Sequence, residues 1–278
     1  MNKFKFLDLK IHCWGGLGSQ LYALAIANSL QAKFKRRRIS LVLHTSGVSK
    51  RLSELNFITN LPFKVTQVND FSSSTRSEYE IIELNEKHFR KILKNVLYFT
   101  RFVCTANTDS EFIKIRPWTL ALRGHYSYRT IESSFYDYLL LNLKEKVSDS
   151  SVNQNVISIH YRMGDLLQLT NKSVYPVEKI VEKVNELTNT NNYSEIIVYS
   201  DSPKNVKDTL ISAGLNKDFN VRDIDTIDVI CECVSSGYFI GTNSKVSLWI
   251  VNIRRFLGNG DLCFLEGFDS RLFLHSDL

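Results

Sequence analysis

The sequence of 278 residues has little of what marks several specialised classes of protein. Only 4 prolines and 12 glycines are present, which excludes collagen-like and linker-like chains. No apolar run approaches the ~18 residues of a membrane span. The apolar stretch after Met1 is short and is broken by Asp8 and Lys10, unlike a signal peptide. We therefore expect a globular, cytosolic protein.

Cysteines and histidines are too scattered for a disulfide framework or a metal site. The five cysteines are odd in number and form no CxxC pair, so we expect free thiols in a reducing compartment. Neither Cys231 and Cys233 nor the histidines have metal-ligand spacing, so no metal is expected. The sequence also lacks a G-x-S-x-G elbow and a Walker loop, which removes the main support for a hydrolase or an NTPase.

The composition is that of a globular chain with an uneven charge. Apolar residues make up 44% and charged residues 23%, and the length suits one large or two small domains. Residues 1–150 carry 23 basic and 13 acidic residues, whereas residues 151–278 carry 12 and 16. The basic half would attract nucleic acid, anionic lipid headgroups or a phosphorylated substrate, and charge alone does not choose among them. The simplest interpretation of the basic run at residues 33–38 is a solvated patch of charge at a helix end.

Apolar periodicity predicts strands that alternate with helices. In the first half we expect strands at Phe6–Cys13 and Ile39–His44 around a helix at Ser19–Lys33, and a helix at Ile131–Lys146. Residues 69–103 show no clean period, and the polar residues 147–155 are the expected linker. In the second half we expect strands at Val156–Tyr161, Ile196–Ser200 and Tyr238–Gly241, and helices at Val177–Leu187, Lys204–Ala213, Ile227–Val234 and Ser247–Phe256. This alternation predicts an α/β fold with parallel sheets and two domains, residues 1–150 and 151–278.

Two motifs follow the first strand of each half. GGLGSQ at residues 15–20 lies between a strand and a helix, where it is either a phosphate- or sugar-contacting loop or a simple turn. It lacks the third glycine and the acidic residue of a dinucleotide fingerprint. HYRMGD at residues 160–165 leaves a buried strand, and the Arg162 guanidinium suits a diphosphate. The alternative is that Arg162 pairs with Asp165 and that His160 is a core histidine.

Two further motifs lie at later strand ends. In YSDS at residues 199–202, Ser202 is explained as a helix cap, and Asp201 is either a loop-fixing acceptor or a ligand contact. The stretch from Asp228 to Trp249 includes GTNSKVS at residues 241–247, a strand end followed by a helix start that offers an anion site. Ser244 and Ser247 would otherwise only cap that helix.

Taken in order, the four motifs resemble those of α-1,2-fucosyltransferases, glycosyltransferase family 11. GGLGSQ is similar to that family's G-G-L-G-N-Q, HYRMGD to its H-x-R-R-G-D, and YSDS to its F-S-D-D. The last stretch is similar to its D…H-x-I-x-x-N-S-T-F-S-W-W. The resemblance spans residues 15–249 and leaves the middle of the chain unmatched. It implies a GT-B fold of two Rossmann-like halves and metal-independent, inverting transfer of fucose from GDP-fucose to a galactose O2 in surface polysaccharide.

The resemblance also implies roles for single residues. Arg162 would hold the diphosphate, His160 would lie near the nucleoside, and Asp228 would accept hydrogen bonds from guanine. The complete set of implied donor-binding residues is Gly16, Gly18, His160, Arg162, Ser200, Asp201, Asp228, Asn243 and Ser244. Gly16 and Gly18 would let their loop close over the donor. Arg162 and Asp165 are the expected catalytic residues, with Asp165 as the base that takes the proton of the acceptor hydroxyl.

Several positions depart from the family motifs. Met163 replaces the second arginine, Ser19 an asparagine, Ser202 an acid, and Lys245-Val246 a Thr-Phe pair. We hypothesise that Lys245 replaces the lost positive charge.

The resemblance also sets expectations for partners and for other function classes. We expect a GDP-sugar donor, a glycan acceptor on a lipid-diphosphate carrier, peripheral contact of the basic half with the inner membrane face, and no nucleic acid. A transferase of another GDP-deoxysugar, a nucleotide-dependent oxidoreductase and a nucleic-acid-binding protein are the alternatives.

Overall fold

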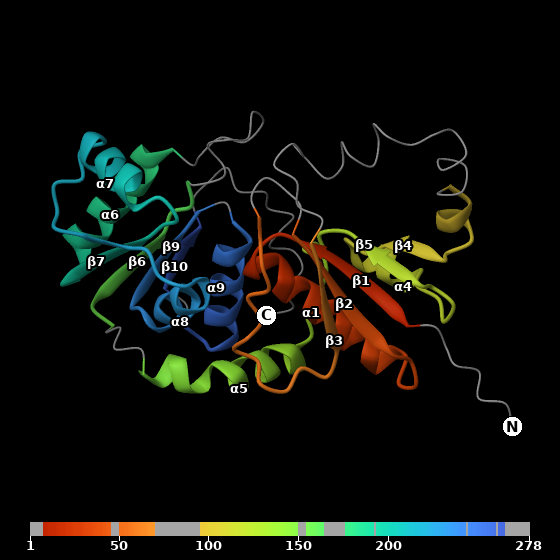
Figure 1. Cartoon of the computed structure of the whole chain (residues 1–278). Coiled ribbons are helices and arrows are strands. Elements are labelled where there is room, and N and C mark those ends of the chain that lie inside the picture. The colour runs from red at the N-terminus through yellow and green to blue at the C-terminus, as the bar shows by residue number, and fades with distance from the viewer. Residues whose placement is uncertain are drawn as a thin grey trace, which may run out of the picture. The chain divides into compact units, whose positions relative to one another are not determined.

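The computed structural model describes residues 8–45, 50–69, 95–149, 154–163, 176–191, 193–242, 244–259 and 261–264. The chain divides into two compact units, the first ending at Phe135 and the second beginning at Tyr136. Each unit is built on one parallel five-stranded sheet (Figure 1). This confirms the expected α/β class with parallel sheets in two Rossmann-like halves.

The first unit contains the strand–helix–strand predicted from the sequence and several shorter elements. Its elements are β1 (Leu9–Trp14), α1 (Leu17–Lys33), β2 (Ile39–His44), β3 (Lys64–Val68), β4 (Val103–Thr105), α4 (Asp109–Ile113) and β5 (Ala121–Arg123). The strand order is β3-β2-β1-β5-β4. Elements β3, β4, α4 and β5 were not predicted, because they are three to five residues long and lie in segments whose apolar residues show no clear run or period.

Helix α1 is apolar on almost its whole circumference. Residues from Leu17 to Ala27 are buried with the exception of Ser19, and the helix packs on β1 and β2. A helix without a polar face is a core helix, since exposing any side of it would bring apolar surface into water. This explains its Ala-rich and Leu-rich sequence and fixes the loop after β1 firmly in the first unit.

The second unit is a doubly wound sheet. Its elements are α5 (Ser133–Asp149), β6 (Val156–His160), α6 (Val177–Thr190), β7 (Glu195–Tyr199), α7 (Pro203–Ser212), β8 (Asn220–Arg222), α8 (Thr226–Ser235), β9 (Tyr238–Gly241), α9 (Lys245–Phe256) and β10 (Leu262–Phe264). The strand order is β10-β9-β6-β7-β8. Figure 1 shows α6 and α7 on one face of the sheet and α8 and α9 on the other.

This strand order creates a switch point beside β6. From β6 the chain builds outward through β7 and β8, then returns to place β9 on the opposite side of β6. Residues after β6 and β9 therefore emerge next to each other at the carboxyl edge, and His160 is paired in register with Gly241. Open α/β sheets bind ligands at such a point, so the fold brings the second and fourth sequence motifs together where a ligand is expected.

Helix α5 extends further than predicted and packs with the second unit. It continues to Asp149 rather than ending at Lys146, and residues 150–153 of the expected linker lie outside the described residues. The Tyr136 ring stacks on Phe256 at 5.2 Å and meets Trp249 edge-on at 6.1 Å between ring centroids. These aromatic contacts to α9 explain why the chain divides in the first turn of the helix, after Phe135, instead of after the helix.

The cysteines of the described residues are not joined by disulfides. All five are thiols, and four of them, Cys13, Cys104, Cys231 and Cys233, are buried. Among the described residues, no helix has both the length and the apolar character needed to cross a bilayer.

Candidate functional site

His160 lies at the carboxyl end of β6, buried in a network of hydroxyl groups. Its Nδ1 is 2.7 Å from Ser247 Oγ and 3.3 Å from Ser244 Oγ, both at the start of α9. Ser244 Oγ also accepts a hydrogen bond from the Ser247 backbone N–H at 3.0 Å and donates to Ser247 Oγ at 3.2 Å. The Ser244 hydroxyl proton is used in the bond to Ser247 Oγ. If the Ser247 hydroxyl then donates its proton to His160, the Nδ1 atom of His160 is the acceptor. The network locks the end of β6 to the first turn of α9.

The same surroundings keep His160 neutral. Burial lowers the pKa of His160 to about 4, assisted by the positive charge of Arg162 and opposed by Asp201. A neutral imidazole with Nδ1 as the acceptor has its proton on Nε2, so the ring presents a fixed donor rather than a charge.

Acid should destabilise the protein through His160. Unfolded histidine takes up a proton near pH 6.5, whereas folded His160 resists it down to about 4, so the free energy of unfolding falls as pH drops between these values, by up to about 3 kcal/mol. His160→Gln, which keeps an acceptor but does not titrate, should remove the His160 part of this dependence in urea unfolding at several pH values. The part due to His12, whose pKa is also lowered to about 4, should remain. His125→Gln, at an exposed histidine, should leave it unchanged. An equal pH dependence in wild type and His160→Gln would contradict this assignment.

Arg162 forms an ion pair with Asp201. Its Nε is 3.9 Å from Asp201 Oδ2 at the end of the neighbouring strand β7. The other oxygen, Asp201 Oδ1, accepts a hydrogen bond from the Met163 backbone N–H at 3.1 Å. Asp201 is thus a loop-fixing acceptor that also orients the guanidinium, which remains partly exposed. Asp165, the expected base, lies outside the described residues.

The position of the family's second arginine is part of the core. The Met163 side chain is 7% exposed and belongs to the apolar cluster that fills the space between the sheet and helices α6 and α7. A second guanidinium at this position would have to be buried among apolar groups, so the structure explains why the residue here is apolar.

The N-terminus of α9 adds positive potential beside Arg162. Ser244 is its N-cap, as expected if this serine has a structural role, and the first turn of the helix contains no acidic residue. Thr242 Oγ1 donates to the His160 carbonyl at 2.8 Å and accepts from the Arg162 backbone N–H at 3.4 Å, so it ties β9 to the loop after β6. Lys245 is the first residue of the helix, and Asn243 lies outside the described residues.

Ser200 and Ser202 act within the loop after β7. Ser200 is buried, and its Oγ accepts the Ser202 backbone N–H at 3.2 Å. Ser202 occupies the N-cap position of α7, but its side chain accepts no backbone hydrogen bond there and instead receives Asn205 Nδ2 at 2.9 Å. Ser202 therefore stands at the expected cap position, but its side chain makes no capping hydrogen bond.

Asp228, the expected guanine acceptor, lies in the first turn of α8 and forms an ion pair with Lys146 of α5. The pairing raises the pKa of Lys146, chiefly through the hydrogen bond to Asp228. No hydrogen bond among the described residues joins Asp228 to the His160 network, so its role in binding stays a prediction. Because α8 starts where β8 ends, Asp228 is at the same carboxyl edge of the sheet as Arg162.

The glycine loop of the first unit is held by its own chain. Glu54 Oε1 accepts the Leu17 backbone N–H at 3.0 Å, so a carboxylate already occupies the N-terminal end of α1. Gln20 donates to the carbonyls of Leu52 at 2.8 Å and Gly15 at 3.2 Å. A side chain on Gly16 would come within 2.9 Å of Glu54 Oε1. These contacts support a structural turn, and donor contacts by Gly16 and Gly18 stay predictions.

The structure also shows a ring cluster that sequence reasoning missed, at the carboxyl edge of the first sheet. The Trp14 and His44 rings stack at 4.3 Å between centroids, and His12 Nδ1 is 2.8 Å from His44 Nε2. The Arg123 guanidinium is 5.9 Å from the Trp14 ring. Burial, followed by the charges of His44 and Arg123, lowers the pKa of His12 to about 4. The available signal was that Trp14 and His44 end neighbouring strands.

No metal site is found in the part of the chain that the structure describes, where no group of three or more His, Cys, Asp or Glu side chains is suitably placed.

Comparisons with known proteins find similarity to solved structures only at low sequence identity. No protein-family model and no curated protein matches the sequence. A family 9 glycosyl transferase from Veillonella parvula is similar with a TM-score of 0.47 at 9% identity, over 91% of this chain and 80% of that chain. The α-1,6-fucosyltransferase NodZ, soaked with GDP-fucose, has a TM-score of 0.46 at 11% identity, over 91% and 93%. POFUT1 in complex with GDP has a TM-score of 0.44 at 12% identity, over 94% and 99%.

Proposed function

We propose that the chain is a glycosyltransferase that binds a nucleoside diphosphate sugar at the switch point of its second unit. The observation that carries the proposal is the placement of Arg162 and the N-terminus of α9 at the ends of adjacent strands. The first turn of α9 contains no acidic residue that would repel an anion. A bidentate guanidinium and helix N–H groups are the donors that a diphosphate uses in proteins. Strand order, helix dipole and side-chain charge therefore all favour a phosphate-bearing ligand.

The same groups suit the chemistry of sugar transfer. The acceptor oxygen attacks C1 of the donor sugar while the bond from C1 to the phosphate oxygen breaks, and the electron pair leaves with the diphosphate. The negative charge that develops there is stabilised by Arg162 and by the α9 dipole. Asp201 keeps the guanidinium oriented, so little reorganisation is needed as the charge develops. The base that receives the acceptor proton is proposed to be Asp165.

The finer assignment rests on the resemblance to α-1,2-fucosyltransferases. We propose that the donor is GDP-fucose, that Asp228 accepts hydrogen bonds from guanine, and that fucose is transferred with inversion to O2 of a galactose in a surface glycan. His160, fixed and neutral, would donate from Nε2 to the donor. Ser200 and Ser244 shape the pocket through the loop contacts described above.

Thermal unfolding with different nucleotides tests the donor site. GDP at a hundredfold its dissociation constant should stabilise the protein by about 2.7 kcal/mol, whereas UDP, CMP and NAD at the same concentration should not. Asp228→Asn should weaken GDP binding about tenfold, since it loses a charge-assisted hydrogen bond to guanine. Asp225→Asn, on the same helix and one turn earlier, is the matched control and should bind GDP as wild type does.

The outcomes separate the parts of the proposal. Stabilisation by UDP instead of GDP would keep a nucleotide-sugar transferase but reject fucose as the sugar. Stabilisation by NAD alone would favour an oxidoreductase. If a folded sample responds to none of the nucleotides, the proposed donor site is wrong.

A further inference from the structure

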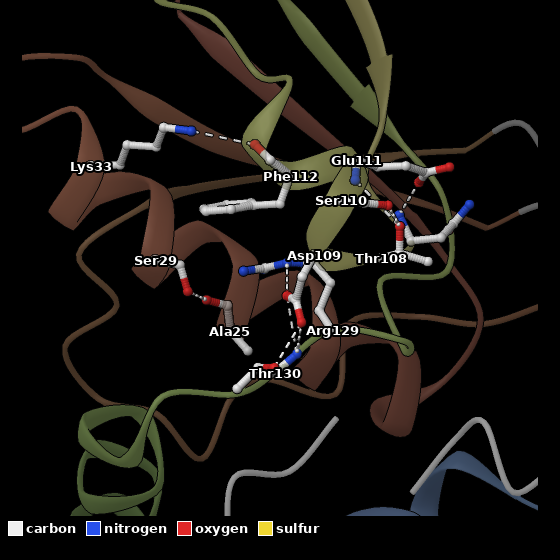
Figure 2. A network of polar contacts seen from close by, with 11 residues as sticks. Ala25, Ser29, Lys33, Thr108, Asp109, Ser110, Glu111, Phe112, Arg129 and Thr130 are labelled. Carbon is white, nitrogen blue, oxygen red and sulfur yellow. Dashed lines mark hydrogen bonds and ion pairs between the residues drawn. The ribbon is translucent and has the colours of Figure 1, made fainter. Parts of the chain in front are cut away.

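Three segments of the first unit form one strongly basic surface. We define the basic surface as residues 33–38, 99–102 and 112–118, which together contain eight lysines and arginines and no acidic residue. The Lys33 amine donates to the Phe112 carbonyl at 3.4 Å (Figure 2). Arg37 is buried and donates to the carbonyls of Pro117 and Thr119. These hydrogen bonds hold the end of α1 against the segment from α4 to β5.

The third segment is attached in the same way. Trp118 Nε1 donates to the Thr100 carbonyl at 3.1 Å, and Thr119 Oγ1 donates to the Arg101 carbonyl at 2.8 Å. The turn at residues 99–102 is thereby fixed beside Trp118. The basic surface is a built feature of this unit rather than three separate loops.

Large apolar side chains stand exposed among these cations. Phe99 is 87% exposed, Ile113 69%, Trp118 52% and Phe102 38%. A folded chain normally buries such groups or scatters them singly. Here each is within a few residues of an exposed cation, namely Arg101, Lys114 or Arg116.

The surface is also hollowed at its most basic part. A cavity of about 330 Å³ is lined by the run from Ala32 to Arg37 and by Pro117. Burial and the neighbouring positive charges of Arg116 and Arg129 lower the pKa of Lys33, which shows how closely the cations are crowded. Two nearby acids are already engaged, since Asp109 pairs with Arg129, as Figure 2 shows, and Asp8 pairs with Arg38 of the surface at 3.8 Å. An external anion would therefore relieve the repulsion.

We propose that the basic surface docks this chain on an anionic lipid bilayer. Lysines and arginines of the surface would contact headgroup phosphates, with one phosphate in the hollow beside Lys35 and Arg36. The exposed Phe99, Ile113 and Trp118 side chains would enter the boundary between headgroups and acyl chains. An aliphatic side chain such as Ile113 has no π face for a base to stack on, so the mixture favours lipid over nucleic acid.

Vesicle flotation of the full chain tests the electrostatic part. Binding to vesicles of phosphatidylcholine with phosphatidylglycerol should be clear at low salt, weaken at high salt, and be absent with phosphatidylcholine alone. The double variant Lys35→Glu/Arg36→Glu should weaken binding about 30-fold or more. The matched control, Lys204→Glu/Lys207→Glu, makes the same change in net charge at exposed lysines of α7 and should bind as wild type does.

The apolar part needs a separate comparison. Ile113→Ser should weaken vesicle binding roughly tenfold, whereas Ile211→Ser, at the similarly exposed isoleucine of α7, should not. Brominated acyl chains should quench the tryptophan fluorescence of bound wild type, and Trp118→Phe should abolish most of the quenching. Equal losses in both members of either pair would overturn the proposal.

An oligonucleotide arm separates lipid from nucleic acid. The surface would be assigned to nucleic acid instead if single-stranded RNA binds more tightly than the anionic vesicles and if Lys35→Glu/Arg36→Glu abolishes this RNA binding. Binding that inorganic phosphate alone reverses at low concentration would likewise reject a bilayer as the partner.

Discussion

Arg162→Ala is expected to lower the rate of sugar transfer from GDP-fucose by about 100-fold to 1,000-fold. The guanidinium is the side-chain cation at the carboxyl edge of β6, next to the N-terminus of α9, where the leaving diphosphate is proposed to lie. Its contribution is largest when the phosphate charge is fully developed, so kcat should fall more than KM rises. Steady-state kinetics with GDP-fucose and a glycan acceptor measure both constants.

Two variants sharpen the Arg162 prediction. Arg162→Lys keeps the charge but loses the planar fork, so it should recover only part of the rate. Asp201→Asn leaves the guanidinium in place and removes its orienting charge, so it should cost far less than Arg162→Ala. All three variants should retain the wild-type melting temperature within a few degrees, because Arg162 is partly exposed. Turnover within threefold of wild type in Arg162→Ala would reject the proposed diphosphate site.

Arg254→Met is expected to destabilise the second unit by about 3–5 kcal/mol. The side chain is 1% exposed, and its guanidinium donates hydrogen bonds to backbone carbonyls. Its Nη1 bonds the carbonyls of Cys233, Val234 and Ser236 at the end of α8 at 2.9, 3.1 and 2.6 Å. Its Nη2 bonds those of Gly237 and Asp261 at 3.2 and 2.9 Å, at the starts of β9 and β10.

The effect is expected to be large because the Arg254→Met variant leaves buried carbonyl oxygens without their hydrogen-bond donors. Methionine fills similar space but donates no hydrogen bond, so a cluster of buried carbonyl oxygens would lose its donors. The melting temperature should fall on the order of 10 °C or more. Arg255→Met, at the exposed neighbour on the same helix, should change it little. Equal melting temperatures for Arg254→Met and wild type would contradict the structural role.

Elements with a clear apolar run or a clear apolar period could be predicted from the sequence. Strands β2 and β9 and helices α1, α6 and α9 lie within a few residues of their expected bounds, because apolar residues form nearly continuous runs along β2, β9 and α1 and a helical stripe along α6. Strands β4, β5, β8 and β10 have three residues each, too few for any period, and their neighbours in the sheet define them.

The partners of the site residues were beyond sequence reasoning. Arg162 forms an ion pair with Asp201 of the loop after β7, and the Ser202 hydroxyl oxygen accepts a hydrogen bond from Asn205 Nδ2. Glu54 occupies the helix end that the glycine loop seemed to offer to a phosphate. Each of these contacts depends on where a loop lies in the folded chain. The partners of a polar side chain are the groups that are near it in space, and these need not be near it in the sequence.

By itself the sequence determined the α/β class, the division into two Rossmann-like halves and the positions of four motifs at strand ends. The tertiary structure alone decided which of these motifs meet. In the order β10-β9-β6-β7-β8, the residues after β6, β7 and β9 emerge side by side, so His160, Asp201 and Ser244 lie at one edge of the sheet although up to 84 positions separate them. Sequence periodicity reports how each strand is buried, but strand order results from the packing of all strands and helices together, and that packing is what places the chemistry.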